Sequence, residues 1–170
     1  SELSQRLGKN LKPISFIGGD LKVVPEYFHD LFGTYIHAFR NAVDHGIETP
    51  GERIASGKDM NGQITLKFER FVQGGQSWLK TEIGDDGRGI DPLRIRRRLE
   101  EKGLPFDPMA TEEELIQSVF RDDFSTANAV TDISGRGVGL AAIRSEAEKM
   151  GGEAFVRSTV GQGSIFTVVV

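Results

Sequence analysis

The stretch His37-Ala38-Phe39-Arg40-Asn41-Ala42-Val43-Asp44-His45-Gly46 places an amide, a carboxylate, a guanidinium and two imidazoles within ten residues. In a helix, side chains four positions apart lie on one face, so His37 and Asn41 are one turn apart with Asp44 beside them. Amide and carboxylate oxygens are ligands that a hard cation such as Mg²⁺ prefers. A polar helix face is also typical of solvated surface, so the stretch by itself leaves both interpretations open.

The residues before this stretch predict a long helix. It starts at Pro25, because proline is tolerated at the first helical position, and Gly46 is a typical end signal. Apolar residues recur at helical spacing and form a wide stripe opposite the polar cluster: Phe28, Leu31, Phe32, Tyr35, Ile36, Phe39, Ala42 and Val43. We therefore expect the helix to bury one side and to present the polar cluster on the other.

The rest of the chain alternates between strand and helix patterns. Strands are predicted at residues 14–17, 63–71, 77–83, 153–158 and 164–170. Further helices are predicted at residues 49–57, 92–102, 111–120, where Thr111 starts a capping box, and 137–150. Residues 121–134 are polar and lack periodicity, so they are predicted to form a loop.

The composition limits the classes of function. A chain of 170 residues fits one compact domain. The net charge of −4 argues against a nucleic-acid-binding surface, and a polyanionic ligand would need local donors. The absence of cysteine excludes disulfides, zinc-thiolate sites and thiol catalysis. No apolar run approaches the length of a membrane span, so we expect a cytoplasmic domain without membrane contact.

A second motif, Asp85-Asp86-Gly87-Arg88-Gly89, follows the strand predicted at residues 77–83. A carboxylate at a strand end, followed by glycines, can face a flat ligand because glycine lets the backbone approach closely. Such a carboxylate would accept a hydrogen bond from the exocyclic amino group of adenine, whereas guanine presents an acceptor there. An Asp-Gly turn is also common in proteins of every kind, so this motif too leaves two interpretations open.

A third motif, Gly135-Arg136-Gly137-Val138-Gly139-Leu140, is predicted to open a helix. Free backbone N–H groups at a helix start bind anions, and Arg136 would add a charge-assisted contact to phosphate. The alternative is a flexible glycine hinge. The spacing matches neither G-x-x-x-x-G-K-[ST] nor G-x-G-x-x-G, which excludes a P-loop and argues against a dinucleotide fold.

In this order the motifs resemble the ATP-binding domain shared by histidine kinases, DNA gyrase, a heat-shock chaperone and mismatch-repair ATPases. The resemblance pairs His37 to His45 with the N box, Asp86 to Gly89 with the adenine-contacting G1 box, Gly135 to Gly139 with the G2 box, Phe124-Ser125-Thr126 with the F box and Gly161 to Ser164 with the last glycine turn. Within this superfamily the chain resembles the CheA-type chemotaxis kinases. Their Arg-Asn-x-x-Asp-His-Gly-Ile-Glu run is present from Arg40 to Glu48, and a Leu7-Gly8-Lys9 opening also fits.

The resemblance implies an α+β fold. It is a two-layer α/β sandwich whose mixed, mostly antiparallel sheet is covered on one face by helices, the Bergerat-type ATP-binding fold. Residues 1–170 would form a single catalytic domain that belongs to a larger multidomain kinase. The implied cofactors are ATP and Mg²⁺.

The resemblance also implies a set of site residues. Asn41 would ligate Mg²⁺, His37 could join it, and Asp86 would bind adenine. The catalytic group would be His37, Arg40, Asn41, Asp44 and His45. The residues that bind ATP would be Asp86, Gly87, Gly89, Phe124, Ser125, Thr126, Gly135, Arg136, Gly137, Val138, Gly139, Leu140 and Ser164.

Position 37 bears on the reaction. Hydrolytic relatives carry a water-activating glutamate four residues before the asparagine, where this chain has His37. The resemblance therefore implies phosphoryl transfer from Mg-ATP to a histidine on a separate phosphotransfer domain in two-component signalling. The implied partners are that domain, a response regulator, and an adaptor or chemoreceptor reached through other domains. No nucleic-acid partner is expected, and the isolated domain is expected to be a monomer.

One departure from the pattern keeps alternatives open. Asp122-Asp123 stands where CheA-type lids usually carry Pro-Gly, and added negative charge near a triphosphate would weaken or reshape lid closure. The first alternative is a catalytically impaired nucleotide-binding module of a signalling scaffold. The second is a hydrolysing ATPase of the gyrase or chaperone type, against which His37 argues.

Overall fold

The computed structural model of the chain describes residues 7–124 and 139–170. Within these ranges a five-stranded mixed sheet has the strand order β1-β2-β3-β5-β4. The strands are β1 Ser15–Ile17, β2 Ile64–Gln73, β3 Gln76–Asp85, β4 Glu153–Thr159 and β5 Gly163–Val169. β1 pairs with β2 in parallel and the other neighbouring strands are antiparallel. The predicted α+β class is confirmed.

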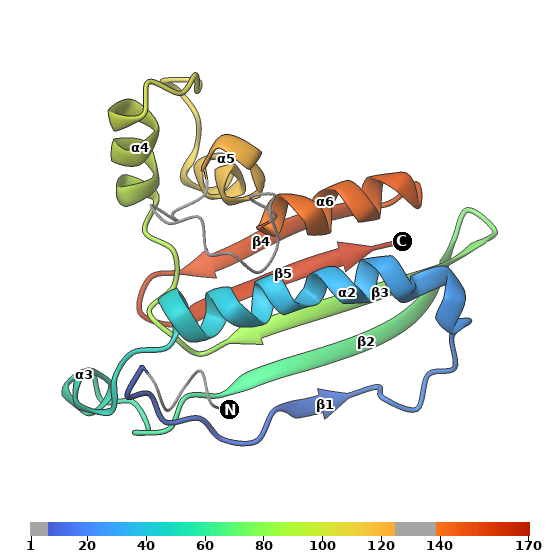
Figure 1. Ribbon diagram of the computed structural model, residues 1–170, viewed down its shortest axis with the longest axis horizontal. Helices are drawn as coiled ribbons and strands as arrows, with labels where there is room; N and C mark the ends of the chain where they lie inside the picture. Colours follow the sequence, from blue (N-terminus) through green and yellow to red (C-terminus); the bar gives the residue numbers. More distant parts are fainter. Residues whose placement is uncertain (1–6, 125–138) are drawn as a thin grey trace.

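Helices cover one face of this sheet, as Figure 1 shows for α2 and α6. The α-helices are α2 Pro25–Asn41, α3 Pro50–Ala55, α4 Pro92–Glu101, α5 Glu112–Ile116 and α6 Leu140–Lys149. Two of the predicted segments differ in conformation from the structure. The helix expected over residues 111–120 begins with the predicted capping box but becomes a 3₁₀ helix at Gln117–Phe120. In the predicted loop 121–134, Asp122–Phe124 forms a 3₁₀ turn, and residues 125–134 lie outside the described ranges.

The main core lies between the sheet and the two covering helices. It combines alternate residues of the strands with one face of each helix: Leu31, Tyr35, Ala38, Ile143, Ala147, Leu66, Ile83, Val156, Phe166 and Val168. The predicted apolar stripe is wrong at Ile36, which is 58% exposed, whereas Ala38 is fully buried. α2 buries a narrower sector than the stripe, because its contact with the sheet and α6 centres on Leu31, Tyr35 and Ala38.

Two smaller clusters complete the packing. Ile95, Leu99, Leu115 and Phe124 join α4 to α5 at the side of the sheet. Ala42, Val43 and Ile64 form a satellite cluster just beyond α2, against which Leu11 and Phe39 pack. Among the helices in the described ranges, none is long and apolar enough to cross a lipid bilayer.

Replacing Ile143 by alanine should lower the free energy of unfolding by about 2–4 kcal/mol, because the side chain is lost from a close-packed interior. Ile143 is 1% exposed, whereas Ile54 on α3 is 62% exposed. The control Ile54→Ala should therefore change stability by less than about 0.5 kcal/mol. Urea denaturation followed by circular dichroism measures both, and equal losses would contradict this placement of the core.

Candidate functional site

α2 does not end as an ordinary helix. Beyond Asn41 the chain continues as a π-helical turn, Ala42–Gly46, which we call the π turn. It is closed by the N–H of Ile47, which donates to the carbonyl oxygen of Ala42 at 2.7 Å. π-helical turns are rare and frequently lie at functional sites. The wider turn alters where Asp44 projects, so α-helical spacing alone does not predict its position relative to Asn41.

Among the described residues, the side chains of Asn41 and Asp44 each carry an oxygen without a hydrogen-bond partner. Oδ1 of Asp44 is buried and accepts no hydrogen bond in the described part of the chain. Within those residues no hydrogen bond to the half-buried Asn41 side chain is present either. A buried carboxylate oxygen without a donor is costly unless a cation or a ligand satisfies it. The pair therefore fits a cation.

Mg²⁺ is compatible with this sparse ligand set. Between residues 7 and 124 and from 139 onward, no three His, Asp or Glu side chains converge as a metal cluster. Mg²⁺ bound to a nucleotide takes most of its ligands from phosphate oxygens and water, and only one or two from protein. The amide of Asn41 and the carboxylate of Asp44 can supply that number.

Both imidazoles of this segment have a pKa below that of a free imidazole. Burial and the charge of Arg40 lower the pKa of the half-buried His37. Burial also lowers the pKa of His45. Because both native pKa values lie below 6.5, the unfolded chain takes up protons first, and stability falls as the pH drops below 6.5.

Positive charge gathers around His45 despite the negative net charge of the chain. Asp44 raises the pKa of His45, while Lys9, Arg94 and Arg88 lower it. These cations come from three different segments: the N-terminal stretch, α4 and the loop after β3. Arg94 and Arg88 can thus supply the local donors that a polyanion would need.

Asp85, the last residue of β3, points toward the π turn. Its Oδ1 accepts the N–H of Gly87 at 2.9 Å, and a Cβ built on Gly46 would lie 3.0 Å from the same oxygen. Burial raises the pKa of Asp85 to about 6, and the neighbouring charge of Asp86 adds to the increase. The carboxylate is thus a buried acceptor that is expensive to ionise.

Both carboxylate oxygens of Asp86, the next residue, accept hydrogen bonds from within the protein. Its Oδ2 accepts from Nη2 of Arg53 at 2.8 Å, and its Oδ1 accepts the N–H of Gln63 at 2.8 Å. Arg53 is only 1% exposed and also donates to Glu48, which Lys58 contacts in turn. The sequence prediction missed this ionic network, because no motif or periodicity marks an arginine on the short helix α3.

The glycine motifs are joined by backbone contacts. The N–H of Arg88 donates to the carbonyl oxygen of Gly46 at 2.9 Å, and its own carbonyl accepts from Gly161 at 2.7 Å. A Cβ on Gly87 would collide with the backbone of Gly46. Glycine is therefore required where the loop after β3 meets the π turn.

The loop after β3 ends at Gly89, whose positive φ of 72° favours glycine at that position. The turn between β4 and β5 lies next to this loop. Ser164 is buried, lies 3.0 Å from the Ser158 hydroxyl through its own Oγ, and is paired with Asp85 across the sheet. The N box, the loop at residues 85–89 and the turn at residues 161–164 therefore meet at one edge of the sheet.

Other predicted ATP-binding residues have different positions. Gly139 caps α6, but the side chain of Leu140 is buried in the main core, so only its backbone can face a ligand. Phe124 is buried in the cluster between α4 and α5. Six predicted residues lie outside the described ranges: Ser125, Thr126, Gly135, Arg136, Gly137 and Val138.

The acidic pair at residues 122–123 is partly neutralised. Arg121 forms a two-pronged ion pair with Asp123, with Nε to Oδ1 and Nη2 to Oδ2 both at 2.9 Å. Hydrogen bonding from Arg121 lowers the pKa of Asp123, and Nζ of Lys102 donates to its carbonyl oxygen at 3.0 Å. The negative charge of Asp123 is thus matched within the same short segment.

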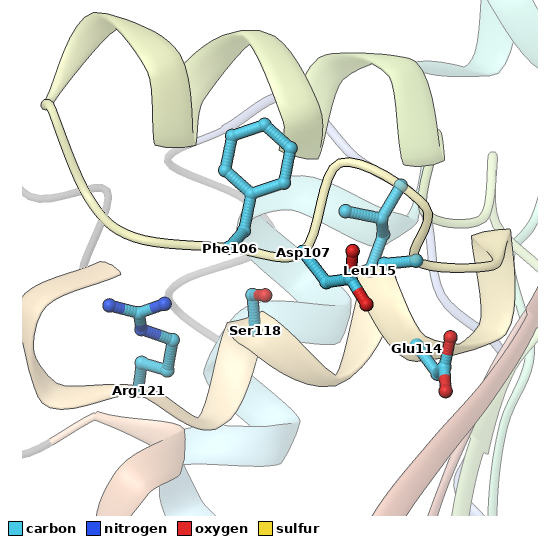
Figure 2. A pocket seen from close by; sticks show the side chains of 7 residues that line it. Phe106, Asp107, Glu114, Leu115, Ser118 and Arg121 are labelled. Carbon is cyan, nitrogen blue, oxygen red and sulfur yellow. The ribbon is translucent and has the colours of Figure 1, made fainter.

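A hollow of about 300 Å³ lies away from these motifs, between the loop after α4 and the α5 region (Figure 2). Its lining includes Phe106 and Leu115 together with charged side chains. Those charges are engaged locally: Asp107 accepts from the N–H of Met109, and Arg121 donates to the carbonyl of Pro105. We interpret the hollow as part of the packing around α5.

Comparison with known proteins gives a consistent result. Residues 33–170 match the family described as histidine kinase-, DNA gyrase B-, and HSP90-like ATPase. The chain is 41% identical to the chemotaxis protein CheA of Borreliella burgdorferi over 170 residues, which is 98% of this chain and 19% of that protein. It is 37% identical to the gliding motility regulatory protein of Myxococcus xanthus, covering 98% of this chain and 21% of the relative. The chain thus spans about a fifth of the length of these relatives.

Solved structures share the fold. The histidine kinase domain of the blue-light activated histidine kinase EL346 from Erythrobacter litoralis superposes with a TM-score of 0.53 at 15% identity, covering 99% of this chain and 59% of that one. Full-length ShkA in complex with AMPPNP gives a TM-score of 0.52 at 18% identity, covering 100% and 27%. At these identities the likeness concerns the fold alone.

The ionic network around Arg53 yields a stability prediction. Arg53→Met should lower the free energy of unfolding by about 3–5 kcal/mol, because Glu48 is left as a buried carboxylate with one partner removed. Arg70→Met is the control, since Arg70 is exposed on β2 and should change stability by less than about 0.5 kcal/mol. Guanidinium denaturation measures both, and a similar small effect at the two positions would refute the role of the network.

Proposed function

This chain belongs to the histidine kinase-, DNA gyrase B- and HSP90-like ATPase family, and we propose that it is the ATP-binding catalytic domain of a CheA-type protein-histidine kinase. It binds ATP with Mg²⁺ and provides the site from which the γ-phosphoryl group passes to a histidine on a separate phosphotransfer domain. The similarity to CheA and to a gliding motility regulator supports a role in two-component signalling.

The observation that carries the proposal is the contact between the π turn and the loop after β3. The Arg88 N–H bonds to Gly46, and the carboxylate of Asp85 lies against the same glycine. A buried acceptor suited to an adenine amino group therefore lies next to the turn that carries Asn41 and Asp44. Asp85 can thus face the adenine of a bound nucleotide while Asn41 and Asp44 face its phosphates and metal.

We assign adenine binding to Asp85 in place of Asp86. Both carboxylate oxygens of Asp86 already accept hydrogen bonds, from Arg53 and from Gln63. Counted from Asp85, the residues read Asp-x-Gly-x-Gly, with the glycines at positions 87 and 89; counted from Asp86, they read Asp-Gly-x-Gly. The raised pKa of Asp85 supports the assignment, because perturbed carboxyls cluster at functional sites.

At the phosphate end, Asn41 and Asp44 would hold Mg²⁺, which neutralises phosphate charge when bound. Arg40 and the exposed His45 flank the triphosphate and supply donors. Phosphoryl transfer depends mainly on positioning and charge neutralisation, which this set can provide. His37 stands where hydrolytic relatives carry the glutamate that activates water, so the set favours transfer over hydrolysis.

The acceptor histidine, the response regulator and an adaptor or chemoreceptor would be reached as partners of the whole kinase. The chain covers only 19–25% of the length of three curated relatives, so these partners belong to the proposal. We propose that the domain acts in the cytoplasm, where such signalling components are found, and that it is monomeric in isolation.

The function can be tested by mixing the purified chain with a CheA-type phosphotransfer domain, Mg²⁺ and γ-labelled ATP. Slow, acid-labile labelling of the acceptor histidine is expected. Asn41→Asp should abolish labelling and alter the magnesium dependence of binding, because a second fixed charge replaces the amide at the metal. Gln76→Glu, an equal charge change at the exposed β2–β3 turn, should leave labelling unchanged.

Two other outcomes would contradict the proposal. ATP binding without any labelled acceptor would favour a module that has lost catalysis, the alternative raised by Asp122-Asp123. Rapid phosphate release without an acceptor would favour a hydrolysing ATPase.

Asp85→Asn should separate affinity from stability. It should weaken ATP binding at least about tenfold in calorimetry, because a hydrogen bond to a charged group is lost. It should also stabilise the nucleotide-free chain at pH 7 by about 2–3 kcal/mol, since the native pKa of about 6 exceeds the ordinary 3.8. The destabilisation by the wild-type carboxylate is absent below pH 3.8 and complete above about pH 6, so the stability gain should vanish near pH 4.

Asp86→Asn is the matched control. It should lower stability, because it weakens the ion pair with Arg53. If Asp86→Asn abolished ATP binding while Asp85→Asn preserved it, adenine binding would return to Asp86.

A further inference from the structure

A lysine far from the N box in sequence holds the end of that box in space. Nζ of Lys9 donates to the carbonyl oxygen of Val43 at 2.6 Å and to that of Asp44 at 2.8 Å. Carbonyl groups in the last turn of a helix lack partners within the helix. A cation there also interacts favourably with the negative end of the helix dipole. Lys9 therefore supplies two charge-assisted hydrogen bonds to the π turn from outside it.

The segment that carries Lys9 is itself fixed to the same region. The N–H of Gly62 donates to the carbonyl of Asn10, and the N–H of Lys12 donates to Gly62, both at 2.9 Å. Leu11 packs against the satellite cluster formed with Ala42 and Val43. The segment thus contacts the π turn through charge at Lys9 and through apolar packing at Leu11.

Donors outside the π turn satisfy at least four of its five carbonyl groups. That of Ala42 accepts from Ile47, that of Gly46 accepts from Arg88, and those of Val43 and Asp44 accept from Lys9. The Asp44 backbone that Lys9 holds bears the carboxylate whose Oδ1 is buried without a hydrogen-bond partner among the described residues. A shift of this turn would move that oxygen relative to Asn41.

We propose that Lys9 is a positioning residue for the magnesium–nucleotide site, holding the π turn so that Asn41 and Asp44 keep their relative placement. The inference rests on the proposed ATP function and deepens it. Residues 9–12 contain no predicted site residue. Under this proposal they influence magnesium binding by fixing the position of the π turn. Adenine binding, which depends on Asp85 at the end of β3, does not pass through this lysine.

The variant Lys9→Met removes the ammonium group and keeps an unbranched side chain. Lys12→Met is the matched control, because it removes the same charge three residues away, where Lys12 pairs with the exposed Asp59. Lys9→Arg retains a cation and should approach wild-type behaviour. Thermal denaturation verifies that each variant is folded.

The first measurement is hydrogen–deuterium exchange of the nucleotide-free chain. In Lys9→Met, the amides of residues 42–47 should exchange at least about tenfold faster, because the turn loses two charge-assisted bonds. In Lys12→Met they should exchange as in the wild type. If the amides of residues 42–47 exchanged at the wild-type rate in Lys9→Met, Lys9 would not hold the π turn and the proposal would be overturned.

The second measurement compares two ligands by calorimetry. Lys9→Met should weaken Mg-ATP binding about tenfold and raise the magnesium concentration needed, while adenosine, which needs no metal, binds as before. Equal weakening of both ligands would indicate a general structural role and overturn the proposal. So would an effect that disappears at high salt, because direct attraction between an exposed charge and the triphosphate is screened by ions.

The wild-type chain separates the two levels of inference. If it binds Mg-ATP and Lys9→Met binds equally well, only the role of Lys9 fails. If the wild type binds neither Mg-ATP nor adenosine, the proposed function fails, and the role of Lys9 fails with it.

Discussion

The close approach of Gly46 and Gly87 is the constraint on which the rest of the site depends. The N–H of Arg88 reaches the carbonyl oxygen of Gly46, and a Cβ on Gly87 would collide with the backbone of Gly46. The contact ties the end of α2 to the end of β3, elements about 40 residues apart in sequence. The contact also holds the π turn, which carries Asp44, beside the carboxylate of Asp85.

The two neighbouring aspartates show how the site is balanced. Asp85 is partly buried and accepts the N–H of Gly87, and its pKa, raised to about 6, reflects the cost of ionising it there. Asp86 is held by Arg53 in an ionic network beneath the loop. A carboxylate that is costly to ionise thus lies next to one that is anchored by an ion pair.

The fold class followed from the resemblance to a known family. Hydrophobic patterns predicted the helices and strands, because they reflect which face of an element is buried. They failed at Ile36, since periodicity marks an apolar stripe but not how much of it meets a neighbour. The family motif assigns the adenine contact to Asp86, and we propose Asp85 instead. Successive residues at a strand end project to opposite sides, and the contacts of Arg53 and Gln63 with Asp86 distinguish the two carboxylates.

The sequence by itself determined the order of the glycine motifs, the polar cluster from His37 to His45 and the family to which they point, because these are properties of local spacing. Tertiary structure alone decided the π turn, the burial of Arg53 and the bonds from Lys9 to Val43 and Asp44. The physical reason is that each depends on groups brought together by the fold. A lysine 34 residues before its acceptor leaves no periodic signal, since hydrogen bonds follow distance in space.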